Sequence, residues 1–186
     1  MRITVKIGLL FAAIWIAIKM IFFMTGLTGD SIQTSAMINI LCLLLSISVG
    51  LYLVKLRATE ETSLMTDIKN GMTSGVPYIL VVSIFMYIFY AEINPEFISH
   101  LRAEKVQAMK TRLDDPATLA RLKSENADFE VMSKEQIFER MKQGPENTIN
   151  AKSTSVLNLL ALLLLATMNS IFVAVIYRKV VFIPRS

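Results

Sequence analysis

Four long apolar runs dominate the sequence and limit what it can fold into. They cover residues 7–26, 36–55, 75–93 and 154–177. Each run is close to the ~20 residues that an α-helix needs to cross about 30 Å of hydrocarbon. Lipid offers no hydrogen-bond partner to an exposed backbone group, so a helix is the economical way to cross it. We therefore predict an all-α membrane protein with four transmembrane helices.

The composition also indicates that lipid, rather than a protein interior, surrounds these runs. Hydrophobic residues make up 54% of the 186 residues and charged residues only 18%, which is too apolar for an ordinary globular surface. The first run contains one charge, Lys19, but its many apolar residues still favour insertion. This run is longer than the apolar core of a cleaved signal peptide and no clear small-residue cleavage site follows it. We expect a retained membrane anchor.

Basic residues indicate the orientation. The loop between the first two runs contains Asp30 and neither Lys nor Arg, whereas the other short flanks are basic: Arg2, Lys6, Lys55, Arg57, Lys69, Arg178, Lys179 and Arg185. The positive-inside rule then places both termini in the cytoplasm, including a basic tail after the fourth helix. Tyr52, Tyr78 and Tyr177 would form an aromatic belt at the cytoplasmic interface.

A short extramembrane segment of helices, residues 95–153, separates the third and fourth runs and would lie on the outer side of the membrane. Three capping signals predict where its helices begin. They are Asn94 before Pro95, Asp115 before Pro116, and the capping box of Ser133 with Gln136. The first helix should end near Leu113, and Gly144-Pro145 should stop the last. We divide the chain into residues 1–94 with three transmembrane helices, residues 95–153, and residues 154–186.

Each membrane helix carries a polar residue towards the same, outer end: Lys19, Asn39, Glu92 and Asn158. Ionisable residues within a membrane usually face the bundle interior and find a partner, so we predict a polar cluster with an ion pair between Lys19 and Glu92. In the alternative interpretation Lys19 reaches the interface, Glu92 lies in water and the asparagines join neighbouring helices.

Small residues four positions apart permit helices to approach closely. The pairs Gly71 with Gly75 and Ser46 with Gly50 are therefore candidate helix-packing residues.

The sequence offers no catalytic, cofactor-binding or metal-binding arrangement. One cysteine, Cys42, excludes an internal disulfide and a cysteine-based zinc cluster, and the single histidine, His100, has no orienting partner in evidence. The metalloprotease, P-loop and dinucleotide motifs are absent from the sequence. We expect no enzyme activity, no cofactor and, because the basic residues form no patch, no nucleic-acid partner.

The stretch "DIKNGMTSGVPYILVVSIFMYIFYAEINPEF" resembles a pattern in the uncharacterised bacterial domain-of-unknown-function family 4199. The residues that carry the resemblance are Lys69, Gly71, Tyr90, Ile93, Asn94, Pro95, Glu96 and Phe97, together with the later "MSKEQI". The resemblance implies a cell inner membrane of the kind found in Bacteroidota. It implies no activity and no site residues.

We expect partners to be the lipid bilayer and either other membrane-protein subunits or further copies of the chain. The first functional interpretation is a non-enzymatic structural or accessory subunit of a membrane assembly. The alternative is a small transporter or permeation unit, in which Lys19, Asn39, Glu92 and Asn158 line an outward-facing cavity.

Overall fold

The computed structural model describes residues 2–26, 32–58 and 62–181. Asp30 and Arg185, which contributed to the predicted orientation, lie outside the described residues. The chain forms two compact units, one of residues 1–86 and 155–186 and one of residues 87–154. We call them the bundle unit and the loop unit and describe each by itself.

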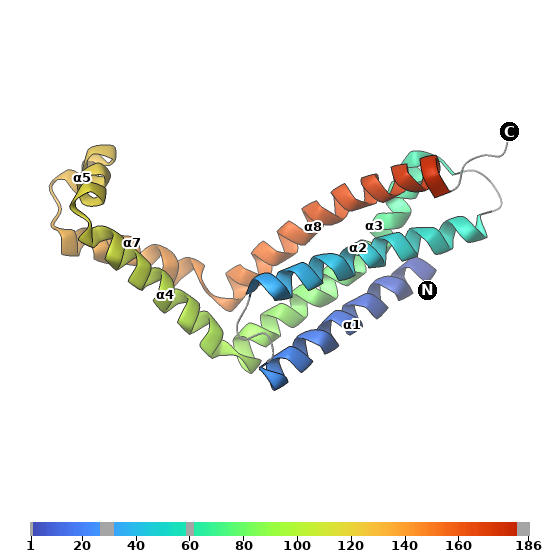
Figure 1. The fold of residues 1–186 in the computed structure, drawn as a ribbon, viewed down its shortest axis with the longest axis horizontal. Helices are drawn as coiled ribbons and strands as arrows, with labels where there is room; N and C mark the ends of the chain where they lie inside the picture. The colour runs from blue at the N-terminus through green and yellow to red at the C-terminus, as the bar shows by residue number, and fades with distance from the viewer. Residues whose placement is uncertain (1, 27–31, 59–61, 182–186) are drawn as a thin grey trace. The chain divides into compact units, whose positions relative to one another are not determined.

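Four long helices account for the bundle unit and the membrane crossings (Figure 1). They are α1 (Ile3–Thr25), α2 (Ile32–Arg57), α3 (Leu64–Ile88) and α8 (Ala151–Ile176). A π-helical segment continues α3 as η1 (Phe89–Ile93), and another continues α8 as η2 (Tyr177–Val181). All four helices are long and apolar enough to cross a membrane, so the chain is an all-α, multi-pass membrane protein as predicted.

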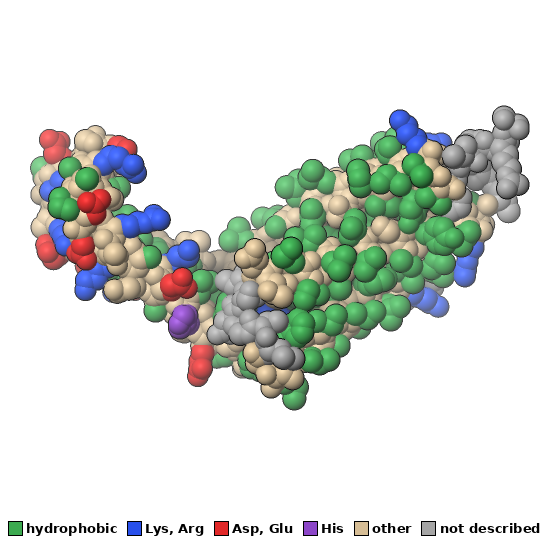
Figure 2. Space-filling view, in the orientation of Figure 1, with side chains coloured by type: hydrophobic (Ala, Val, Ile, Leu, Met, Phe, Trp, Pro, Cys, Tyr) green, Lys and Arg blue, Asp and Glu red, His purple; other side chains and the backbone are tan. Residues whose placement is uncertain are grey.

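The face of the bundle unit that Figure 2 shows is apolar over most of its length. Large hydrophobic side chains are more than half exposed on every long helix: Leu10, Ile21, Met37, Leu41, Ile84, Leu164, Met168 and Phe172. An apolar surface of this extent is rare on a soluble monomer but is what lipid tails cover. The exposure pattern therefore agrees with the membrane assignment.

Helix α3 begins earlier than the sequence predicts. Its first residue is Leu64 rather than a residue near position 75, and Ser63 accepts a hydrogen bond from the amide of Thr66 at 3.2 Å. The prediction used apolarity to place the boundary and assigned Asp67 and Lys69 to a loop. A helix that carries polar residues in its first turns gives no such apolar signal, so the helix begins before the apolar run, and the membrane-crossing part at residues 75–93 stays a prediction.

Small residues bring α1 and α2 close to α3 around Ser74. A Cβ atom at Gly8 of α1 would overlap the backbone carbonyl oxygen of Ser74, and one at Gly50 of α2 would lie 2.7 Å from the Ser74 hydroxyl oxygen. About two turns further along the same face of α1, Trp15 is buried and its ring packs edge-to-face on Phe85 of α3, with centroids 5.9 Å apart. Close backbone approach and aromatic packing therefore hold these helices together.

The loop unit consists of four shorter helices, α4 (Pro95–Asp114), α5 (Pro116–Glu125), α6 (Ala127–Glu130) and α7 (Lys134–Thr148). Its predicted caps are confirmed. Asn94 accepts from the amide of Phe97, Asp115 from the amides of Ala117 and Thr118, and Ser133 with Gln136 forms a reciprocal capping box. Leu113 of α4 and Ile137 of α7 are buried and supply the apolar contact of this unit.

The predicted stop at Gly144-Pro145 is wrong, because α7 continues through both residues to Thr148. A glycine stop requires a left-handed backbone conformation. Among the described residues only Gly26, at the end of α1, has a positive φ. The amide of Ile149 instead closes the helix on the carbonyl of Pro145 at 2.8 Å.

The cap at Asp115 also makes the stability of this helix start depend on pH. Hydrogen bonds from the Thr118 hydroxyl and from the amides of Ala117 and Thr118 hold the pKa of Asp115 below its ordinary value. A lowered pKa in the folded state stabilises the fold above the unfolded pKa of about 3.9, and that contribution is lost as pH falls through the folded value. The start of α5 is therefore weakened only in acid.

Replacing Gly8 with Ala tests the close approach of α1 and α3. The added methyl group has no room beside the Ser74 carbonyl, so we expect a loss of about 1–3 kcal/mol in unfolding free energy. Thermal unfolding in detergent, followed by the fluorescence of the buried Trp15, measures the change. Ala13→Val, which enlarges an exposed residue of the same helix, is the matched control. Equal melting of the two variants would contradict the packing described here.

Candidate functional site

A carboxylate lies within the first turn of α3 and is completely buried. Asp67 is the residue concerned, and its side chain has no exposed surface. A carboxylate near a helix N-terminus is favoured by the helix dipole. Full burial nevertheless removes its water, and such a charge is tolerated only when other groups neutralise it. The surroundings of Asp67 therefore form the principal candidate site.

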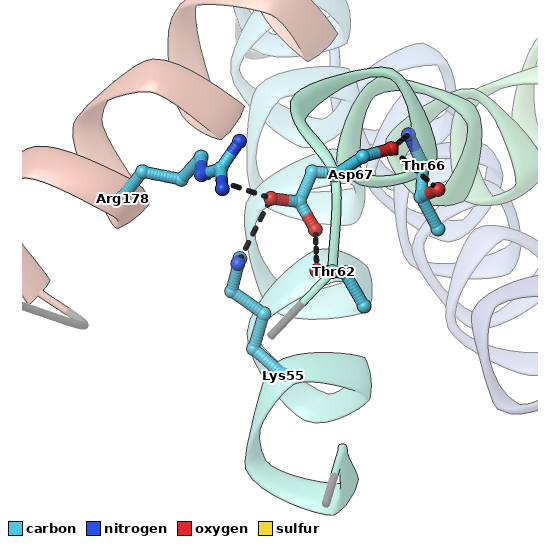
Figure 3. A network of polar contacts seen from close by, with 6 residues as sticks. Lys55, Thr62, Thr66, Asp67 and Arg178 are labelled. Carbon is cyan, nitrogen blue, oxygen red and sulfur yellow. Dashed lines mark hydrogen bonds and ion pairs between the residues drawn. The ribbon is translucent and has the colours of Figure 1, made fainter. Parts of the chain in front are cut away.

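Three segments of the chain supply partners to Asp67 (Figure 3). The ammonium nitrogen of Lys55, near the end of α2, lies 2.9 Å from Oδ2. The Nε atom of Arg178, in η2, lies 4.0 Å from the same oxygen. The hydroxyl of Thr62, just before α3, donates a hydrogen bond to Oδ1 at 2.5 Å. We call these four residues the Asp67 clamp.

The two cations of the clamp differ in how strongly they attract the Asp67 carboxylate. The Lys55 side chain is 11% exposed, whereas that of Arg178 is 37% exposed. Water screens the longer and more exposed Arg178 contact, so the Lys55 pair carries most of the attraction. One anion between two cations leaves an excess of one positive charge. Because its charged groups come from the end of α2, from η2 and from the start of α3, the clamp holds these three helix ends together.

Contacts between α2 and α8 strengthen the same end of the bundle unit. The hydroxyl of Tyr177 donates to the carbonyl of Ser48 at 3.1 Å. Its ring also packs edge-to-face on Tyr52, with centroids 6.2 Å apart. The segment that carries Arg178 is thus held against α2 by groups outside the clamp.

Hydroxyl groups continue the connections from α3 to its neighbours. The Ser74 hydroxyl donates to the carbonyl of Ser46 at 2.8 Å, and the two hydroxyl oxygens lie 3.0 Å apart. At the start of α8, the hydroxyl of Ser155 donates to the carbonyl of Ser83 at 2.6 Å. Such bonds between membrane helices contribute about 0.6 kcal/mol each on average. They position helices rather than activate a reactant.

The remaining predicted packing residues also lie on α3. A Cβ atom at Gly71 would lie 3.0 Å from the Ser170 hydroxyl oxygen of α8, and one at Gly75 would lie 3.2 Å from Ile47 of α2. Gly71 and Gly75 are therefore the points where α3 meets two neighbours at once. Ser46 and Gly50, on α2, both face Ser74.

The structure places the four residues of the predicted polar cluster in different surroundings. Asn39 is buried, and both its backbone carbonyl and its Oδ1 accept from the Tyr78 hydroxyl, at 3.0 and 2.6 Å. Lys19 is half-buried in α1, and Asn158 is half-buried in α8 with an amide nitrogen that finds no hydrogen-bond partner among the described residues. Glu92 is exposed in η1 of the loop unit. The Lys19–Glu92 pair joins two separately described units and stays a prediction.

Tyr78 corrects the predicted aromatic belt. Its side chain is fully buried, and it lies about 21 Å along the helix from Leu64 at 1.5 Å per residue. It therefore serves as a hydrogen-bond donor between α3 and α2 and is not an interfacial residue. Tyrosine at the edge of an apolar run satisfies either description, so the sequence pattern alone was ambiguous.

The sequence analysis also overlooked Asp67. Its signal was weak, since Asp67 is one of three carboxylates, with Glu60 and Glu61, between the second and third apolar runs. The interpretation failed because residues before position 75 were assigned to a solvated loop. Once the helix is extended to Leu64, a buried acid at its first turn demands a cation from a neighbouring helix.

Comparison with known proteins gives a family without an activity. The family described as a protein of unknown function (DUF4199) matches residues 6–179. The chain belongs to this family. The match includes Lys55, Asp67 and Arg178 and confirms the resemblance that the third-run pattern indicated. No curated protein and no solved structure matches the chain.

Within this DUF4199 member, the Asp67 clamp can be tested through stability. Asp67→Asn leaves Lys55 without its counter-ion in a buried position, and breaking a buried pair costs about 3–5 kcal/mol. We expect a large fall in the thermal midpoint, again followed by Trp15 fluorescence. The double variant Asp67→Asn with Lys55→Met removes the stranded charge and should recover much of the loss.

Lys69→Met provides the matched control, because Lys69 is an exposed cation two residues further along α3. It should leave the midpoint nearly unchanged. A midpoint for Asp67→Asn equal to that of the control, or no recovery in the double variant, would show that the clamp does not fasten the helices.

Proposed function

We propose that this chain is a non-enzymatic structural or accessory subunit of a larger membrane assembly. The observation that carries the proposal is the use of the buried Asp67 carboxylate. It joins α3 to cations of α2 and η2, and so fixes three helix ends instead of standing open to a reactant. A bundle fastened in this way offers its partners a constant surface.

The hydrogen bonds along α3 support the same proposal. Ser74, Tyr78 and Ser83 each take part in a bond to a neighbouring helix, at three levels of α3. The position of Asn39 gives no support to the alternative hypothesis, a small transporter. Its carbonyl and side-chain oxygens accept the Tyr78 hydroxyl rather than lining an open path.

We further propose the bacterial inner membrane as the location, with both termini in the cytoplasm and residues 95–153 in the periplasm. Basic residues at the ends of α2 and α8 support this orientation, since Lys55, Arg57, Arg178 and Lys179 all belong to short flanks. The loop unit would then present its helices to periplasmic partners.

Val131 offers a site to test the assembly role. It is an apolar residue of the loop unit and is 89% exposed, so a probe there can reach a partner that contacts this part of the unit. A photo-crosslinking amino acid at position 131, used in native membranes, should yield a discrete adduct with another membrane protein. The same protein should co-purify with the tagged chain in mild detergent at fixed stoichiometry.

Substitutions give the comparison for this experiment. Val131→Glu should abolish co-purification, and Glu130→Gln, at the exposed neighbouring position, should preserve it. Repeated recovery of this chain alone, or equal recovery from both variants, would count against an accessory subunit.

Cysteine labelling tests the orientation separately. On a Cys42→Ala background, Ser124→Cys places a thiol in α5 and Lys179→Cys places one in η2, both at exposed positions. A membrane-impermeant maleimide applied to intact spheroplasts should label position 124 at once and position 179 only after permeabilisation. The reverse pattern would overturn the proposed orientation and leave the assembly role to its own test.

A further inference from the structure

A cavity of about 510 Å³ lies within the loop unit between α4, α5 and α7. Pockets of about 300–1,000 Å³ are the size that binds small organic molecules in proteins. All its lining residues belong to the loop unit. The cavity therefore shares no residue with the Asp67 clamp.

The lining of this cavity combines cations with apolar side chains. Lys105 and Arg112 of α4 and Arg121 of α5 supply three positive charges, and no Asp or Glu is among the lining residues. Met109, Leu122 and Met141 supply apolar surface from three different helices. An anionic head group with an apolar tail matches both features, since a cavity of one sign attracts the opposite charge and apolar walls favour burial of hydrocarbon.

The cations of the cavity are available to a ligand to different degrees. Arg121 is paired with Glu125 one turn along α5, at 3.3 Å. Within the part of the chain that the structure describes, Lys105 and Arg112 form no ion pair. A bound anion therefore gains most of its electrostatic attraction from the two α4 cations, Lys105 and Arg112.

Two contacts connect the helices that form the walls of the cavity. The guanidinium of Arg102 donates two hydrogen bonds to the carbonyl of Ile149, at 3.3 and 2.9 Å, and so ties the end of α7 to α4. The Lys134 ammonium pairs with Asp114 at 2.5 Å and ties the start of α7 to the end of α4. A pocket formed before its ligand arrives loses less entropy on binding.

We propose that this cavity binds a single-chain amphipathic anion, with a carboxylate or phosphate head at Lys105 and Arg112 and an acyl chain against Met109, Leu122 and Met141. A free inorganic anion would leave the apolar walls uncovered, and a neutral lipid would leave the two α4 cations without a counter-charge. The proposal does not depend on the accessory-subunit role.

Photo-crosslinking of the full chain in phosphatidylcholine nanodiscs tests the proposal. The probe is a dodecanoate that carries a diazirine in its chain, and mass spectrometry maps the labelled peptides. We expect labelling on the peptides that contain Met109, Leu122 or Met141. Unlabelled dodecanoate or dodecyl phosphate should compete, whereas dodecanol and inorganic phosphate at the same concentration should not.

Two double variants with equal charge changes complete the experiment. Lys105→Gln with Arg112→Gln should weaken competition by dodecanoate about tenfold, the effect of losing two partly exposed charge contacts. Lys110→Gln with Lys123→Gln, which removes two cations of α4 and α5 outside the lining, should leave it unchanged. Circular dichroism checks that both variants keep their helices.

Several outcomes would overturn the proposal. Labelling confined to the apolar spans would indicate an anion in the surrounding bilayer. Equal competition by dodecanol would remove the role of the head group, and equal competition by inorganic phosphate would remove the role of the chain. Equal effects of the two double variants would indicate a general attraction of charge. Loss of the Val131 adduct alone would leave the cavity intact, so the two proposals fail independently.

Discussion

A buried charge must be neutralised by its own protein, and this requirement organises the bundle unit. Asp67 has no exposed surface, so Lys55 and Arg178 must approach it from two other helices. Each of these cations closes a helix, and the carboxylate begins a third. One interaction therefore fixes the register of three segments that lie far apart in the sequence. Loss of the carboxylate would leave two cations repelling each other at the same place.

Helix α3 is the element through which the other three are connected. Its small residues face α1, α2 and α8, its Ser74 hydroxyl bonds to α2, and its Ser83 carbonyl accepts the hydroxyl of Ser155 from α8. In lipid, burial of hydrocarbon gives little reason for one apolar helix to prefer another, so close packing and polar contacts decide the arrangement.

Most helix starts, which depend on neighbours in the chain, could be predicted from the sequence, whereas the polar contacts between helices, which depend on neighbours in space, could not. The caps at Asn94, Asp115 and Ser133 follow from two or three adjacent residues, and the structure forms all three. The burial and ion pairs of Asp67 were not predicted, because its partners are residues of other helices. Tyr78 was misplaced for the same reason, since only the packing of α2 against α3 brings its hydroxyl to Asn39.

The free-energy cost of a charged side chain differs between the two units, because a carboxylate is buried in one and the ion pairs are largely exposed in the other. This difference decides which charged groups are available to bind a partner. In the bundle unit the buried carboxylate of Asp67 is bound to its counter-charges, because an isolated charge there would have to leave water. In the loop unit the ion pairs of Asp114 with Lys134 and of Asp128 with Arg140 are largely exposed and contribute little to stability. The fold of that unit depends instead on its caps and on the burial of Leu113 and Ile137. Lys105 and Arg112 take no part in these stabilising contacts. They can therefore bind a ligand in the cavity without weakening the helices that carry them.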